Sequence, residues 1–166
     1  MERATSVRQD FDRVIAALDY PLLIATTAAA GERAGCLVGF ASQSSIDPPA
    51  FLACLSRRNR TYRVAIEADA LAIQCLSSED ADLAELFGAE TGDAIDKFDR
   101  CEWSSGPAAM PILDRAPAWF VGSIAAKADV GDHVAFVLSP IAAELRRDFE
   151  PLPMSFGARL EPGHEA

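Results

Sequence analysis

The chain has 166 residues, half of them hydrophobic, which is enough for one domain with a sizeable core and argues against disorder. Its 25 acidic and 15 basic residues give a net charge of −10, which disfavours nucleic acids and anionic membranes as partners. A few local bases could still hold an anionic cofactor. No run approaches the ~18 apolar residues of a membrane span, and the polar start MERATSVRQDFDR lacks the apolar segment of a secretion signal. We therefore expect a single cytoplasmic domain over residues 1–166.

The cysteines and histidines predict no metal site. Cys36, Cys54, Cys75 and Cys101 show no CxxC spacing, so a zinc or thioredoxin-type motif is not expected. We interpret the first three as small buried hydrophobes in a reducing compartment and expect Cys101 to be partly exposed. His133 and His164 are the only histidines, and they lie too far apart to indicate a histidine-rich metal centre.

The N-terminal third predicts a helix followed by a hairpin. Apolar residues recur at helical spacing over residues 10–18, which predicts a short amphipathic helix that ends before Pro21. Residues 22–27 and 34–42 then read as two strands joined by a turn around Gly31.

The stretch GCLVGFASQSSIDPP, residues 35–49, is the first candidate site. Its apolar run is followed by the hydroxyl and amide side chains of residues 42–45, which we interpret as a donor-rich loop. Pro48 and Pro49 then end any helix or strand, because proline has no backbone N–H to donate. Such a stiffened loop suits a polar or phosphorylated ligand, although an ordinary serine-rich turn remains an equal alternative.

A second candidate site follows the next strand, which we expect over residues 50–55. Three arginines (57, 58 and 60) lie among Ser56, Asn59 and Thr61 in a chain that is otherwise strongly acidic. Such a cluster can hold a phosphate by charge-assisted hydrogen bonds. The alternative is a solvated loop whose arginines pair with surface carboxylates. We favour the anion site slightly, and we expect Thr61 to cap a short helix over residues 62–67.

The rest of the chain predicts four further strands and one further helix. The strands are expected over residues 71–76, 118–126 and 133–138, with a short one near 154–156, and the helix over residues 81–87. Many short strands with hairpin turns and few helices indicate an antiparallel barrel or sandwich. Closing a barrel also removes exposed strand edges.

Several short motifs together resemble the flavin reductase-like family, over roughly residues 21–160. The most specific are Ser45-Ile46-Asp47-Pro48-Pro49 and the Gly131-Asp132-His133 turn. They stand in order with these other motifs: Thr26-Thr27, Gly31, Gly35, Leu86-Phe87-Gly88, Lys97-Phe98, Pro111-Ile112-Leu113 and Pro151-Leu152. The resemblance implies a mainly β fold, an antiparallel Greek-key split β-barrel that binds FMN, carries a few short flanking helices and pairs as a homodimer.

The resemblance also implies an activity. It predicts an NAD(P)H-dependent flavin reductase that takes FMN or FAD, with hydride transfer from the nicotinamide of NADH or NADPH to flavin N5. In two-component systems such a protein passes reduced flavin to a monooxygenase partner. The alternative is an FMN-binding barrel that serves as a redox carrier or flavin-binding module without NAD(P)H turnover.

Site residues follow from the resemblance by position. The segment 39–45 would line the flavin ring and ribityl chain; it comprises Gly39, Phe40, Ala41, Ser42, Gln43, Ser44 and Ser45. Ser56, Asn59, Arg60 and Thr61 would face the phosphate, and Phe98 would lie close to the flavin pocket. His133 matches the family histidine near the nicotinamide, with a hydrogen-bonded turn residue as the alternative. Leu37, Gly39 and Phe40 stand where relatives often carry hydroxyl or amide side chains, so more of the binding would fall to backbone amides.

Overall fold

The computed structural model describes residues 2–161 and residue 163 of the chain. The helices are α1 (Glu2–Leu18), α2 (Arg60–Ala65), α3 (Ala81–Ala89), α4 (Met154–Gly157) and the short 3₁₀ turns Lys97–Arg100 and Pro107–Ala109. The strands are β1 (Leu23–Ala29), β2 (Glu32–Val38), β3 (Ala41–Ser45), β4 (Ala50–Ser56), β5 (Ala70–Cys75), β6 (Trp103–Ser105), β7 (Pro111–Leu113), β8 (Ala118–Asp129) and β9 (His133–Leu145).

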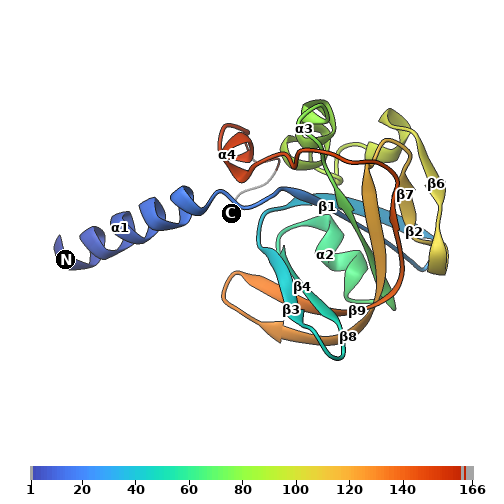
Figure 1. Cartoon of the computed structure of the whole chain (residues 1–166), viewed down its shortest axis with the longest axis horizontal. Coiled ribbons are helices and arrows are strands. Elements are labelled where there is room, and N and C mark those ends of the chain that lie inside the picture. The colour runs from blue at the N-terminus through green and yellow to red at the C-terminus, as the bar shows by residue number, and fades with distance from the viewer. Residues whose placement is uncertain (1, 162, 164–166) are drawn as a thin grey trace.

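Seven of the strands form one antiparallel sheet in the order β2-β1-β5-β8-β9-β4-β3, and β6 pairs with β7 beside it. The sheet curls around α2, which packs against β1, β2 and β4 (Figure 1). The predicted mainly β, antiparallel barrel with a few short helices is confirmed. Among the described residues no helix is long and apolar enough to cross a membrane.

Successive side chains of each strand point to opposite faces of the sheet, so the sheet packs against a different cluster on each face. On β1, Leu23 and Ala25 face the interior of the barrel, where they join Phe136 of β9 in one buried cluster. The residue between them, Ile24, faces the other way and packs with Phe87 of α3 in a second cluster. α3 therefore covers the outer face of the sheet at β1 and the edge strand β2, and α2 lies within the barrel.

One buried side chain ties the small β6–β7 hairpin to the barrel. Gln74 of β5 is fully buried and donates to the hydroxyl of Thr26 (2.9 Å) and to the carbonyl of Pro111 (3.3 Å). Its carbonyl oxygen accepts the backbone N–H of Leu113 at 2.5 Å. A buried amide is tolerated because its hydrogen-bonding groups find partners.

The structure corrects the prediction of a donor-rich loop over residues 42–45. These residues belong to β3, an edge strand that pairs with β4, and the strand expected over 34–42 ends at Val38. The side chains of residues 42–44 are exposed. Exposed edge strands carry polar residues on both faces, so the sequence shows no alternation that would reveal the strand. The turn that follows contains the two prolines, as expected.

Several other predicted elements differ in type or in bounds. β8 and β9 begin as predicted but extend to Asp129 and Leu145, beyond the predicted ends at 126 and 138. The strand predicted near 154–156 is wrong: these residues form α4, whose Met154 and Phe156 pack against the cluster beneath α3. The first helix is longer than predicted and spans Glu2–Leu18. α2 begins two residues earlier than predicted, because the side chain of Asn59 caps it by accepting the N–H of Thr61.

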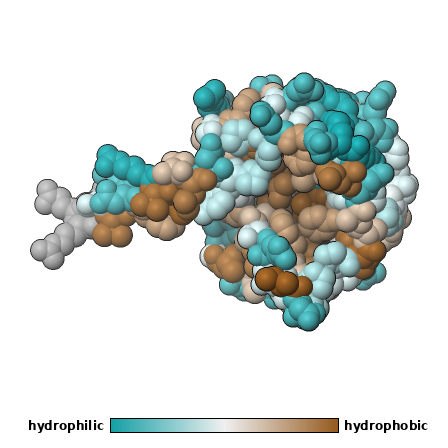
Figure 2. Space-filling view, in the orientation of Figure 1, coloured by the Kyte–Doolittle hydropathy of each residue, from teal (hydrophilic) through white to brown (hydrophobic). Residues whose placement is uncertain are grey.

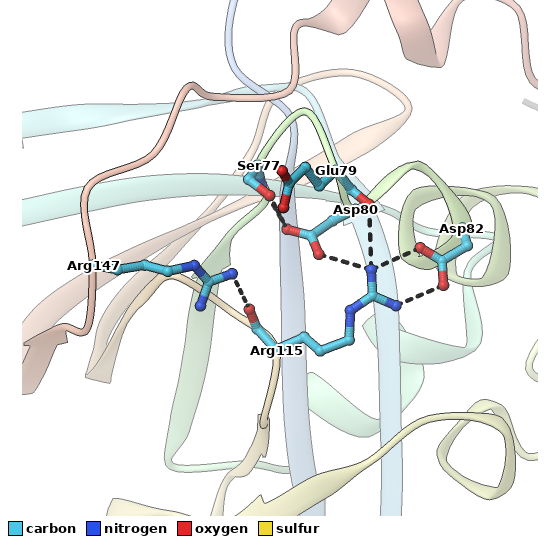
Figure 3. A network of polar contacts seen from close by, with 6 residues as sticks. All are labelled: Ser77, Glu79, Asp80, Asp82, Arg115 and Arg147. Atoms are coloured by element: carbon cyan, nitrogen blue, oxygen red, sulfur yellow. Dashed lines mark hydrogen bonds and ion pairs between the residues drawn. The ribbon is translucent and has the colours of Figure 1, made fainter.

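A buried carboxylate anchors the start of α3 to the chain beyond β7. The Asp80 side chain is 3% exposed and accepts both the N–H (2.8 Å) and the hydroxyl (2.6 Å) of Ser77. Arg115 reaches it at 3.0 Å and also binds Asp82 through both of its terminal nitrogens (Figure 3). Arg147 holds the backbone of this arginine by donating to the Arg115 carbonyl at 2.8 Å. The guanidinium thus compensates a charge that burial would otherwise destabilise.

We predict that Arg115→Met lowers the free energy of unfolding by about 3 kcal/mol, because it leaves the buried Asp80 carboxylate without its cation. Urea-induced unfolding at pH 7 measures the change. The matched control is Arg13→Met on α1, whose ion pair with Asp10 at 3.6 Å is exposed, so a change of less than about 0.5 kcal/mol is expected. Equal effects of the two substitutions would contradict a stabilising role for the Arg115 network.

The same variant should change how stability depends on pH. The Arg115 hydrogen bond lowers the pKa of the Asp82 carboxyl below its ordinary value. A lowered pKa in the folded state stabilises the protein above the unfolded-state value, and this stabilisation is lost as the pH falls through the folded-state value. Arg115→Met should therefore flatten the decline in stability at acidic pH relative to the parent chain.

Candidate functional site

The polar residues of the candidate site meet where two paired strands have adjacent ends. Ser56 is the last residue of β4 and His133 is the first residue of β9, and the two are register partners in the antiparallel ladder. The chain leaves β4 in a tight turn in which the N–H of Asn59 donates to the carbonyl of Ser56 at 3.0 Å. This pairing holds three side chains, from two strands and a helix cap, at one place.

His133 is fixed on two sides. Its Nδ1 lies 2.7 Å from an Asp132 carboxylate oxygen, which leaves Nε2 as the ring nitrogen available to a ligand. The Phe40 ring lies against the imidazole, with ring centroids 5.1 Å apart and planes tilted by 60°. The hydrogen bond from His133 lowers the pKa of the exposed Asp132 carboxyl, so Asp132 stays ionised at neutral pH.

These residues line a groove of about 270 Å³, which we call the His133 groove. Its apolar walls come from Leu22, Val38 and Leu55, and its polar edge comes from Ser56, Asn59 and His133. An apolar cleft with a few convergent polar groups is typical of sites for small organic ligands and cofactors. A flat heteroaromatic ring with polar atoms on its rim matches this donor set, so the groove fits a flavin or nicotinamide ring.

The C-terminal helix α4 supplies another wall. Met154, Gly157 and Ala158 line the groove opposite the strands. A Cβ on Gly39 would lie 3.0 Å from Cε of Met154, so the glycine lets α4 approach the strand end closely. The sequence prediction missed these C-terminal residues, because a short proline-flanked segment carries no signal that it returns to the N-terminal strands.

Residues 56–61, which we call the arginine loop, lie beside the groove, and carboxylates hold two of the three arginines, Arg57 and Arg60. Arg57 pairs with Asp129, and Arg60 binds Glu32 at 3.0 Å. On α2, Arg63 binds Asp93 at 2.5 Å. These exposed pairs match the alternative given for the loop, a solvated surface with paired arginines. Exposed pairs are weak, so an anion could still take over such an arginine, and the phosphate site remains a prediction.

A second, larger cavity of about 410 Å³ lies on the other side of Asn59. It contains Arg60, Thr61 and Phe98, together with Lys97. Asn59 lines the His133 groove, and it also joins Arg60 and Lys97 around a small space of about 20 Å³. The predicted residues from Ser56 to Thr61 therefore fall on two hollows that adjoin at the start of α2.

Lys97 is a residue that the site prediction missed. It is buried, and its ammonium donates to the carbonyls of Phe87 (2.9 Å) and Gly35 (3.3 Å). Burial lowers its pKa from the usual value, with the nearby Cys36 and Glu90 opposing the change. The signal available in the sequence was a lone lysine between acidic residues, which marks no cofactor site by itself.

The predicted site residues 39–45 are divided between the groove and the edge strand β3. Gly39 and Phe40 line the His133 groove, whereas Ala41, Ser42, Gln43, Ser44 and Ser45 continue along the edge strand away from both hollows. Within this strand the Gln43 amide donates to the carbonyl of Ser45 at 3.1 Å. A role for these five residues in binding remains a prediction that needs a ligand long enough to reach the edge of the sheet.

Two thiols line the groove as neutral groups. Burial raises the pKa of both Cys36 and Cys54 above the ordinary thiol value, although the neighbouring Thr61 hydroxyl opposes the shift at Cys36. All four cysteines are free. In the part of the chain that the structure describes, no three His, Cys, Asp or Glu side chains gather as a metal site would require, and His164 lies outside that part.

The fold is an antiparallel barrel with a histidine-edged groove at the ends of two paired strands. The chain itself belongs to the family described as "Flavin reductase like domain", which its residues 15–159 match. The family resemblance expected from the sequence is thereby confirmed.

Individual relatives agree with this family. The FMN reductase (NADH) RutF of Stutzerimonas stutzeri is 30% identical over 154 residues, which cover 93% of this chain and 87% of the relative. The stachydrine N-demethylase reductase subunit Stc3 of Rhizobium meliloti is 33% identical over 116 residues, 68% of this chain but only 49% of the relative.

Solved structures support the fold. The NADH:FAD oxidoreductase SgcE6 of Streptomyces globisporus, solved with NAD and FAD fragments, superposes with a TM-score of 0.79 at 22% identity. The match covers 90% of this chain and 89% of that one. A flavin reductase domain protein of Arthrobacter gives a TM-score of 0.78 at 20% identity, over 88% and 89% of the two chains. At these identities the likeness shows the shared fold alone.

Proposed function

We propose that this protein is an NAD(P)H-dependent flavin reductase that takes FMN or FAD. The flavin supplies a ring that accepts a hydride from the nicotinamide. The observation that carries the proposal is the convergence of Ser56, Asn59 and His133 at one groove in a chain of the flavin reductase family. The similarity to relatives named for FMN and NADH supports the choice of both ligands.

The residues divide the work of binding. The apolar walls of the His133 groove, together with Phe40, would hold a flat ring and exclude water from one of its faces. Ser56 and Asn59 would position the ring and its side chain. Beyond Asn59, Arg60 and Thr61 would face the phosphate, with Arg60 exchanging its exposed pair with Glu32 for the anion.

His133 would orient the nicotinamide or its amide from Nε2, while the Asp132 carboxylate holds the imidazole. A positioning role for His133 is sufficient for hydride transfer, because this reaction needs no strong acid or base from the protein. Its rate depends on how the nicotinamide ring is placed against the flavin ring. Phe40 limits the freedom of the imidazole from its other side.

We also propose the extent of the domain, its oligomeric state, its location and its partner. We propose that residues 1–166 act as one flavin reductase-like unit, pair as a homodimer and remain in the cytoplasm, where the four free cysteines fit a reducing compartment. Similarity to a demethylase reductase subunit and, in fold, to a monooxygenase component B supports an oxygenase as the protein that receives reduced flavin.

Absorption spectra test the proposed activity directly. Under anaerobic conditions the purified protein with added FMN should bleach the flavin band near its visible maximum when NADH or NADPH is supplied. NAD(P)H oxidation should require the flavin. A protein that binds FMN tightly and never oxidises NAD(P)H would contradict the reductase and indicate the alternative, a redox carrier or flavin-binding module.

The phosphate site gives a second prediction. We expect the double substitution Asn59→Ala and Arg60→Ala to weaken FMN binding by about 10- to 100-fold while riboflavin, which lacks the phosphate, is affected much less. A charge-assisted hydrogen bond is worth about 1.5–3 kcal/mol. Fluorescence quenching of the two ligands measures the difference.

Arg63→Ala is the matched control, because Arg63 is an α2 arginine that pairs with Asp93 but lines neither hollow. It should leave both affinities within about twofold. If the double variant loses FMN and riboflavin equally, the arginine loop does not hold the phosphate.

The third prediction concerns the histidine. His133→Ala should slow flavin reduction by NADH by about 10²-fold with flavin affinity unchanged, because a misplaced reactant costs about that much. Asp132→Asn keeps an oxygen that can accept the imidazole N–H, so its loss should be smaller. Stopped-flow reduction together with a flavin titration separates the two effects. An unchanged reduction rate in His133→Ala would make His133 a structural turn residue.

A further inference from the structure

The cavity of about 410 Å³ beyond Asn59 is larger than a single phosphate requires. We call it the β2 cavity, because residues 31–35, at the start of β2, form one of its walls. Its other walls come from the start of α2 and from residues 92–98. The volume falls within the roughly 300–1,000 Å³ of a typical ligand pocket, so a further chemical group can enter beside a phosphate.

Thr61 brings an unpartnered hydroxyl to this cavity. Its side chain is 1% exposed, and its Oγ1 is a buried oxygen that makes no hydrogen bond within the described chain. The neighbouring Cys36 thiol is only a weak donor. The cap of α2 uses the backbone N–H of Thr61 and not the hydroxyl. Because buried hydroxyls normally have partners, this one is available to a ligand in the cavity.

Lys97 brings a buried ammonium to the same cavity. It is 5% exposed, and two of its three N–H groups donate to the carbonyls of Gly35 and Phe87. In the part of the chain that the structure describes, no carboxylate pairs with this ammonium, although Glu90 is near enough to favour its charge. A buried charge without a counter-ion is unfavourable, so an anion in the cavity would stabilise it.

The other charged side chains of the cavity are already paired. Arg33 binds Asp96 at 2.7 Å, and Arg60 binds Glu32 at 3.0 Å. Asp93 accepts from an arginine of α2 at 2.5 Å. These paired charges largely cancel, so the buried ammonium gives the cavity a positive site in a chain that is strongly acidic as a whole.

The rim of the cavity suits a nucleobase. The guanidinium of Arg33 lies over the rings of Phe98 and Trp103, with its central carbon 5.7 and 5.0 Å from the two centroids. Nucleobases stack on arginine guanidinium planes held in this way. β2 is the outermost strand at this edge of the sheet, so one row of its N–H and C=O groups has no neighbouring strand. Adenine carries a donor and an acceptor side by side and can pair with such groups.

We propose that the β2 cavity binds the adenosine 5′-phosphate part of a dinucleotide whose redox ring lies in the His133 groove. Lys97 and Thr61 hold the phosphate, and Arg33 stacks on the adenine. The two hollows adjoin at Asn59, so one ligand can occupy both. This inference rests on the proposed function, because that function places a flavin or nicotinamide ring in the groove.

FAD and NAD(P)H both carry an adenosine 5′-phosphate, and the place proposed for the flavin favours FAD. The proposed function puts the flavin phosphate at Arg60 and Thr61, where the groove meets the cavity. The second phosphate of FAD is joined directly to the first, so its adenosine continues into the cavity. FMN ends at the first phosphate and leaves the rest of the cavity to water.

Calorimetric titration of the full chain at one salt concentration tests the site, with AMP as the probe. AMP should bind and should displace FAD but not riboflavin, and FAD should bind at least about tenfold more tightly than FMN. AMP that displaces NADH and leaves FAD bound would support the adenylate site and assign it to the nicotinamide dinucleotide. AMP that displaces neither dinucleotide would overturn the proposal.

Arg33→Met removes the surface on which the adenine stacks. It should weaken the dinucleotide that AMP displaces by about tenfold and change the affinity for FMN by less than about twofold. The matched control is Arg100→Met, because Arg100 is an exposed arginine that lines a different hollow. It should leave both affinities unchanged. An Arg33→Met protein that binds the dinucleotide as the parent does would rule out stacking at this position.

Thr61→Val tests the anion site without disturbing the fold, because valine has nearly the same shape and the hydroxyl has no partner to lose. AMP should bind this variant about tenfold more weakly, whereas adenosine, which lacks the phosphate, should be unaffected. Thr61→Ser keeps the hydroxyl and should retain the affinity for AMP. Equal affinities for AMP in the parent and in Thr61→Val would contradict a phosphate at this hydroxyl.

These experiments separate the adenylate site from the proposed activity. A protein that reduces FMN and FAD equally well with NAD(P)H and is insensitive to AMP would contradict the adenylate site and leave the reductase intact. A protein from which AMP displaces FAD but which never oxidises NAD(P)H would contradict the reductase and leave the adenylate site intact.

Discussion

The antiparallel register between β4 and β9 is the constraint on which the site depends. It places Ser56 opposite His133, and the turn after β4 then carries Asn59 to the same edge. Because side chains alternate between the two faces of a sheet, a shift of one residue would move His133 away from the groove. The register is secured by the alternate residues of the same strands, Leu55 of β4 and Phe136 and Leu138 of β9, which are buried in the barrel.

The elements around this pair determine how large and how polar the groove is. α4 closes one wall because Gly39 has no side chain, and β1 contributes Leu22 just before its first residue. The polar groups come from three separate places in the sequence: the end of β4, the cap of α2 and the start of β9. The strands β4 and β9 therefore supply both the core and the groove, because their successive side chains face the barrel interior and the groove in turn.

The sequence predicted most of the barrel, and the reasons are visible in particular elements. The β1–β2 hairpin was predictable because Gly31, with φ of +80°, separates two runs that alternate towards the core. β3 and α4 were not predictable, since β3 is polar on both faces and α4 is one turn held by contacts with Tyr20 and Asp19. Of the site, the residues near His133 and the arginine loop were identified, but nothing local could show which carboxylates the arginines would bind or that the hollows would adjoin at Asn59.

Two features of this chain, the aromatic Phe40 at the groove and the exposed apolar side of α1 (Figure 2), leave hydrophobic surface in water. Phe40 lies between β2 and β3 and is half exposed, so the mouth of the groove is itself partly hydrophobic. Covering such a surface with a flat ring or a helix is favourable, because it removes apolar area from water. A flat ring bound at the mouth of the groove would cover part of this surface, so the burial of apolar area would contribute to its affinity.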